Sequence, residues 1–189
     1  ELGQPPVRVG DALGVVDAGR YLYEVNRMEK ATQVGARFAV VTDPVAPELT
    51  GKSLVGEVVG SDTLAQGDRI PAEALGLITC TSTACTETGT SRFCTCTIDT
   101  TSTGPFARIL DRIQLFAPDV AEANLVVEYR GSGLGYAGDP NGMDVAPLTT
   151  VRITGVDFTP AVLFGSRTFD LPDSTYSLTM EDASGTGSN

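Results

Sequence analysis

The chain has no histidine and no tryptophan among its 189 residues, and its only lysines are Lys30 and Lys52. The absence of histidine excludes Ser-His-Asp and Cys-His catalysis, HExxH zinc sites and histidine-based proton shuttling. Glycoside hydrolysis needs a matched pair of carboxylates, and no two acidic residues stand out as such a pair. The sequence therefore predicts a protein that is not an enzyme.

Long apolar runs and clustered positive charge are also absent. No run of 18 apolar residues occurs and no signal peptide is recognisable, so no segment of the printed sequence is expected to span a bilayer. The formal net charge is −11, and residues 42–189 carry −11 whereas residues 14–41 sum to +1. Nucleic-acid binding requires clustered lysine and arginine, so the charge balance argues against this class. A near-neutral N-terminal segment is joined to an acidic, solvent-facing body.

Residues 12–41 carry the pattern of one long helix. Its apolar stripe, at a spacing of three to four residues with a gap at Glu29, consists of Val15, Ala18, Leu22, Val25, Thr32, Ala36 and Ala39. Asp43-Pro44 should end the helix, because a residue before proline is disfavoured in the α region. The 28 residues from Gly14 to Val41 give a length of roughly 42 Å. A small domain is narrower than this, so part of the helix is expected to project.

The remaining segments predict an α+β fold with an antiparallel sheet. A second, short helix is expected from Pro105, with Ile109, Leu110, Ile113 and Phe116 on its buried face. The expected strands are residues 54–60, 123–130, 148–158, 166–171 and 174–180, with a threonine-rich hairpin at 79–101. The predicted organisation is an N-terminal assembly or anchor helix (1–42), a linker (43–53), an acidic β-rich domain (54–182) and a flexible tail (183–189).

Four cysteines lie close together at Cys80, Cys85, Cys94 and Cys96, in a segment that holds 11 threonines among residues 79–104. Such a cysteine-dense loop is typical of exported proteins. The spacing C-x4-C-x8-C-x-C is not that of a usual zinc site, so disulfides are favoured. Three pairings are possible. A nested arrangement, with Cys80–Cys96 outside Cys85–Cys94, suits a hairpin that turns at Thr88-Gly89-Thr90.

Residues 131–144 form a glycine-rich run, GSGLGYAGDPNGMD. The run has neither the Lys-Ser/Thr of a P-loop nor the Rossmann spacing, so no cofactor is predicted. Asp139, Asn141 and Asp144 are weak candidates for calcium ligands, because the pattern D-x-[DN]-x-[DN]-G is met only in part. A solvated turn without a metal is the favoured interpretation.

Residues 14–40 resemble the N-terminal signature of the TadE/TadG-like family, the minor pilins (pseudopilins) of the tight-adherence (Tad, type IVc) pilus. The step G-[IV]-x-[ED]-x-G-R is matched by Gly14, Asp17, Gly19 and Arg20. The aromatic-rich turn that follows is matched by Tyr21 and Tyr23, and the GAR(Y/F)A continuation by Gly35-Ala36-Arg37-Phe38-Ala39. The likeness covers about 30 residues.

The preceding apolar stem of the family is altered in this chain. Glu1 stands at the position of the stem glutamate and Pro6-Val7 at that of its Pro-Val pair. Polar residues or glycine replace apolar ones at Gln4, Arg8, Gly10 and Asp11.

The resemblance implies a helix that packs on other helices, because small residues let backbones approach closely. The residues expected in this interface are Glu1, Gly14, Asp17, Gly19, Arg20, Tyr21, Leu22, Val25, Gly35, Ala36 and Arg37. Arg20 has two possible roles, snorkelling at a membrane interface or pairing with Asp17.

The resemblance also implies a function: a non-enzymatic structural subunit of a bacterial surface pilus that acts in pilus assembly and surface adhesion. Its partners would be other pilin subunits, in a homo- or hetero-oligomer, and the inner membrane before assembly. Its location would be the periplasm or the cell surface. Two alternatives are the main subunit of a self-assembling extracellular filament and a secreted glycan- or calcium-binding module.

Overall fold

The computed structural model describes residues 9–89, 93–94, 96–140, 142–161 and 167–180. The helices are α1 (Val9–Ala39), α2 (Glu48–Gly51) and α3 (Pro105–Gln114), with short 3-10 turns η1 (Ala72–Ala74) and η2 (Glu122–Asn124). The strands are β1 (Val58–Val59), β2 (Asp62–Thr63), β3 (Leu77–Cys80), β4 (Cys85–Thr88), β5 (Leu125–Arg130), β6 (Leu148–Ile153), β7 (Asp157–Phe158), β8 (Phe169–Asp170) and β9 (Ser174–Thr179).

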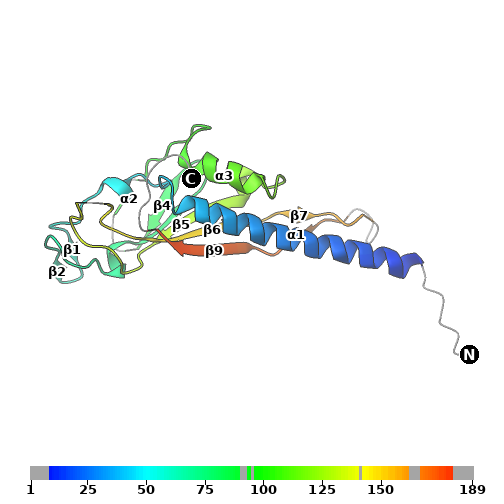
Figure 1. Cartoon of the computed structure of the whole chain (residues 1–189), viewed down its shortest axis with the longest axis horizontal. Coiled ribbons are helices and arrows are strands. Elements are labelled where there is room, and N and C mark those ends of the chain that lie inside the picture. Colours follow the sequence, from blue (N-terminus) through cyan, green and yellow to red (C-terminus); the bar gives the residue numbers. More distant parts are fainter. Residues whose placement is uncertain (1–8, 90–92, 95, 141, 162–166, 181–189) are drawn as a thin grey trace, which may run out of the picture.

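The body is built on a five-stranded antiparallel sheet in the order β4-β3-β5-β6-β9. Side chains of β5 and β6 alternate between more and less buried positions, as expected of strands with one face toward a core. Helix α1 packs against β6, β9 and α3, and it extends well past the sheet at its N-terminal end (Figure 1). The predicted α+β class, with a long N-terminal helix and an antiparallel sheet, is therefore confirmed.

Helix α1 has 31 residues and begins at Val9, three residues before the expected start. It ends at Ala39, shortly before Asp43-Pro44, and the Thr42 hydroxyl donates a hydrogen bond to the Phe38 carbonyl oxygen at 2.9 Å. The C-terminal half belongs to the core. Its fully or almost fully buried residues are Met28, Ala31, Thr32, Ala36 and Ala39.

Helix α3 forms where it was predicted, with Pro105 in its first turn. Its buried side chains are Phe106, Ile109, Leu110 and Ile113. Phe116 was expected on the same face, and this was wrong, because the helix ends at Gln114 and leaves Phe116 42% exposed.

The cysteine hairpin differs from the prediction. Strands β3 and β4 are joined by residues 81–84, and Cys80 stands directly opposite Cys85 with their Cα atoms 4.0 Å apart. Disulfides join Cys80 to Cys85 and Cys94 to Cys96, so the nested pairing was wrong. The reason is the position of the turn, which lies at residues 81–84 and so brings Cys80 opposite Cys85. The expected turn at Thr88-Gly89-Thr90 instead starts where β4 ends, and Thr90 lies outside the described residues.

Two further segments also differ in detail. Residues 43–53, predicted as a linker, contain α2 and pack on the body: Val45, Ala46 and Leu49 are buried, and the Tyr129 hydroxyl accepts a hydrogen bond from the Val45 N–H at 2.9 Å. The strand expected at 166–171 does not join the main sheet. It forms β8, which pairs with β7 as a separate two-stranded ribbon. The tail 183–189 lies outside the described residues.

Candidate functional site

The N-terminal half of α1 exposes an apolar surface, which we call the outer face and define as Val15, Val16, Gly19, Leu22 and Tyr23. The exposed fractions are 72% for Val15, 53% for Val16, 60% for Leu22 and 65% for Tyr23. A Cβ built on Gly19 would meet nothing within 4 Å. Residues three and four apart are neighbours on a helix, so these side chains form one continuous strip.

The same side of α1 becomes polar toward its C-terminal end. Asn26, Lys30 and Arg37 continue the strip and are exposed. Arg37 lies in the last turn, where a positive charge is favourable beside the negative end of the helix dipole. The apolar part of the strip is therefore confined to the half of α1 that extends past the sheet (Figure 1).

The opposite side of this half is held by the β7–β8 ribbon. Asp17 is only 3% exposed, and its Oδ1 accepts a hydrogen bond from the Ala161 N–H at 2.8 Å. Arg20 Nη1 lies 3.5 Å from the same oxygen, so Arg20 pairs with Asp17. The Tyr21 ring meets the Phe158 ring edge-to-face, with centroids 5.5 Å apart. Asp17 and Tyr21 thus contact β7 and the residues just after it, which lie far away in sequence, while Arg20 pairs with Asp17 within the helix.

A groove of about 400 Å³ lies between α1 and the ribbon. Its lining residues are Asp17, Ala18, Tyr21, Phe158, Pro160, Phe169 and Asp170. The sequence pattern did not predict this groove. The clustering of Phe158, Pro160 and Phe169 around a short hairpin was the available signal.

The remaining described residues that were expected in the interface are packed within this chain or half-buried. A Cβ on Gly35 would lie 2.7 Å from Ile113 Cγ1, and Ala36 is fully buried, so both residues are occupied by packing within this chain. Val25 is half-buried against the core, and Gly14 is half-buried. Glu1 lies outside the described residues.

The calcium candidates are arranged around Asp144, which organises the loops by accepting hydrogen bonds. Its carboxylate accepts the N–H of Leu54 at 2.6 Å, the N–H of Asp139 at 3.1 Å and the Ser53 hydroxyl at 3.2 Å. Burial raises the pKa of Asp144, but these donors and the Gly138 N–H outweigh it and lower the pKa. Donors directed at the carboxylate disfavour a cation there.

Asn141 lies outside the described residues. Across the ranges that the structure describes, no three histidine, cysteine, aspartate or glutamate side chains are grouped to hold a metal ion.

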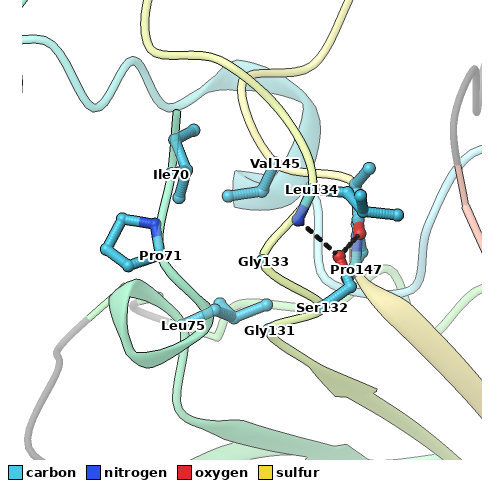
Figure 2. Close-up of a pocket in the computed structure, with 10 residues that line it drawn as sticks. Ile70, Pro71, Leu75, Gly131, Ser132, Gly133, Leu134, Val145 and Pro147 are labelled. Carbon is cyan, nitrogen blue, oxygen red and sulfur yellow. Dashed lines mark hydrogen bonds between the residues drawn. The ribbon is translucent and has the colours of Figure 1, made fainter. Parts of the chain in front are cut away.

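The glycine-rich run is folded rather than a solvated turn. Ala137 is fully buried and its N–H donates to the Asp68 carbonyl oxygen at 2.9 Å. Gly135 has φ +108°, and a Cβ there would lie 2.2 Å from the Asp144 carbonyl oxygen. Figure 2 shows the neighbouring cavity, where the Ser132 hydroxyl bridges the Ala146 carbonyl and the Leu134 N–H. Its volume of about 10 Å³ leaves room for one water molecule at most.

A more polar groove of about 190 Å³ lies at the threonine-rich segment. It is lined by Ser82, Asp99, Thr100, Thr101, Ser102, Phe106, Ala107 and Glu122. Asp99 is anchored there by the Thr101 N–H at 2.9 Å, and hydrogen bonds from Thr101 lower the pKa of Asp99.

Comparison with protein-family models, with curated proteins and with solved structures finds no match to this chain. Within the described residues, no helix is both long enough and apolar enough to cross a membrane.

Proposed function

We propose that the protein is a non-enzymatic, pilin-like structural subunit of a bacterial surface pilus, of the TadE/TadG-like minor type. Its role is pilus assembly and surface adhesion, at the periplasmic face or the cell surface. The partners are other pilin subunits, which contact the N-terminal half of α1, and the inner membrane before assembly. The proposal rests on the motif in α1 and on the outer face.

The outer face is the observation that carries the proposal. Four large apolar side chains, Val15, Val16, Leu22 and Tyr23, are at least half exposed on one strip. Contiguous apolar surface of this kind marks an interaction site, because its transfer out of water is favourable. Gly19 in the middle of the strip gives a second helix room to approach closely.

The division of α1 into two halves also supports assembly through the outer face. The C-terminal half is fixed in the core through residues such as Met28 and Ala31. The β7–β8 ribbon supports the other half through Asp17 and Tyr21. A supported helix costs less conformational entropy when a partner binds it than a disordered segment would.

The experiment is to replace Leu22 by glutamate in the producing bacterium and to measure the amount of this chain in sheared surface fibres. The control is Gln33→Glu, which adds the same charge on the same side of α1 but outside the outer face. We expect L22E to reduce incorporation at least tenfold and Q33E to leave it unchanged. Equal incorporation of L22E and the wild-type chain would contradict the proposal, provided that both purified variants have wild-type thermal stability.

A second candidate function is glycan binding at the polar groove near Thr101. Carboxylates and hydroxyls there, from Asp99, Glu122 and Ser102, are groups that hydrogen-bond sugar hydroxyls. Stabilisation of the purified chain against heat by a panel of oligosaccharides would support it. If no sugar changes the melting temperature and L22E reduces incorporation into fibres, glycan binding is rejected and the pilin proposal is the one supported.

A further inference from the structure

We propose that the groove between α1 and the β7–β8 ribbon binds an aliphatic cation, namely a lysine or arginine side chain presented by a polypeptide partner. The groove is a different surface from the outer face, and the proposal does not depend on the pilus assignment. It rests on the size of the groove, on its aromatic walls and on its carboxylates.

The size of the groove fits a ligand. Its volume of about 400 Å³ lies within the range of ligand pockets, roughly 300–1,000 Å³. By contrast, the cavity in Figure 2 has about 10 Å³ and is a packing space. Ligand pockets are mostly apolar and carry a few polar groups that set specificity. The lining of the groove between α1 and the ribbon has this composition.

The walls are suited to a cation because three aromatic rings of the described residues line the groove. They are Tyr21, Phe158 and Phe169. The face of an aromatic ring attracts a guanidinium or ammonium group within about 6 Å of its centroid. The chain already uses this attraction at the edge of the groove, where the Arg20 guanidinium carbon lies 5.6 Å from the Phe158 centroid.

The charges around the groove favour a positive ligand. Asp17 and Asp170 line it, and among the described residues that line the groove there is no lysine or arginine. Asp157 stands directly opposite Asp170 across the ribbon, an arrangement of like charges that is unfavourable without a nearby cation. Arg20, which pairs with Asp17, offsets one of these three carboxylates. Arg167, two residues before β8, is exposed and does not line the groove.

The two carboxylates have different positions, which suggests different roles. Asp17 is buried and its Oδ1 is already hydrogen-bonded to the Ala161 N–H. Asp170 is exposed, so it is the carboxylate that meets the charged end of an entering side chain. The aliphatic stem of lysine or arginine then packs on the rings, as such stems do on apolar surfaces.

The place of the groove on the helix favours a polypeptide as the source of the cation. Ala18 lines the groove and is the i,i+4 neighbour of Leu22 of the outer face. Residues at this spacing adjoin on a helix surface. A chain lying along this half of α1 therefore reaches the groove and the outer face at the same time.

The test is an NMR titration of the purified chain with a short amphipathic peptide that carries one arginine. The matched probe has citrulline at that position, which keeps the shape and removes the charge. We expect the arginine peptide to shift the ring signals of Tyr21, Phe158 and Phe169, and to bind roughly tenfold more tightly than the citrulline peptide, from the combined cation–π and ion-pair attraction. Equal binding of the two peptides, or no shift of these rings, would overturn the proposal.

A pair of variants localises the effect. D170N removes the exposed carboxylate of the groove, and D62N removes an equally exposed carboxylate in the distant β1–β2 hairpin. We expect D170N to weaken the arginine peptide several-fold without changing the citrulline peptide, and D62N to change neither. A third probe, n-butylguanidinium, separates the sources: affinity as high as that of the peptide would show a site for free cations and would refute the polypeptide assignment.

Discussion

Gly35 and Gly19 lie in the same helix, and replacing each by alanine should change the free energy of unfolding in different ways. At Gly35 the new Cβ would lie 2.7 Å from Ile113 Cγ1 and 2.8 Å from Ile113 Cδ1. Ile113 is fully buried, so any shift of its side chain takes place within a packed core. At Gly19 the new Cβ would meet nothing within 4 Å.

The magnitude follows from two opposing effects. Alanine is favoured over glycine in a helix interior by about 1 kcal/mol. Forcing an extra methyl group into a packed core costs about 1–3 kcal/mol. G19A should therefore gain about 1 kcal/mol of stability, whereas G35A should range from neutral to a loss of about 2 kcal/mol.

The assay is urea unfolding of both variants and the wild-type chain, followed by circular dichroism, with the slopes against urea compared to check that unfolding remains two-state. The decisive quantity is the difference between the two variants, since helix propensity cancels in it. A difference of about 1–3 kcal/mol is expected. If both variants gain stability equally, α1 does not pack on α3 at Gly35 and the proposed division of the helix is wrong.

Three other predictions concern the body. Y129F leaves the buried Val45 N–H without its acceptor and should cost about 1–3 kcal/mol in urea unfolding. Burial raises the pKa of Tyr129, so the folded chain keeps the hydroxyl proton above pH 10, where the unfolded chain loses it. The free energy of unfolding should therefore fall as the pH rises from about 10. In Y129F this fall should be less steep than in the wild-type chain. The pKa of Asp144 is lowered on folding, so its charged carboxylate stabilises the folded chain above the carboxyl pKa of the unfolded chain, and this stabilisation is lost as the pH falls below about 4. D144N should therefore lower the free energy of unfolding at pH 7 and weaken its dependence on acid pH. Thermal unfolding measured at a series of pH values checks this. Trypsin cleaves after Arg92, so under non-reducing conditions the Cys80–Cys85 and Cys94–Cys96 peptides should separate in a mass spectrum; one linked species would contradict this pairing and leave the two pairings that cross Arg92, of which the nested one is an example.

Local patterns predicted the parts of the fold that local chemistry decides. The helical spacing before Asp43-Pro44 and the proline at Pro105 located α1 and α3 to within a few residues. Alternating apolar residues located β5, β6 and β9, because each has a face against the core. The threonine-rich strands β3 and β4 lack a strong apolar alternation, so their turn was misplaced, and the disulfide pairing with it.

The candidate site depends on contacts that no local pattern contains. Asp17 and Ala161 are separated by 144 residues, yet they form a hydrogen bond between α1 and the segment that follows β7. The resemblance placed Asp17, Arg20 and Tyr21 in an interface with other helices, and it did not predict that they make contacts within the same chain. Sequence spacing also could not distinguish Gly19, which is open, from Gly35, which is packed, because both lie in one helical stretch.

The central claim is that the outer face of α1 joins this chain to a fibre built mainly from another subunit. The most direct measurement is negative-stain electron microscopy of surface fibres isolated from the source bacterium, with mass spectrometry of their composition. We expect fibres of another pilin that contain small amounts of this chain. Uniform fibres made mainly of this chain would show it to be the main subunit, and fibres that lack it would contradict its role in the pilus.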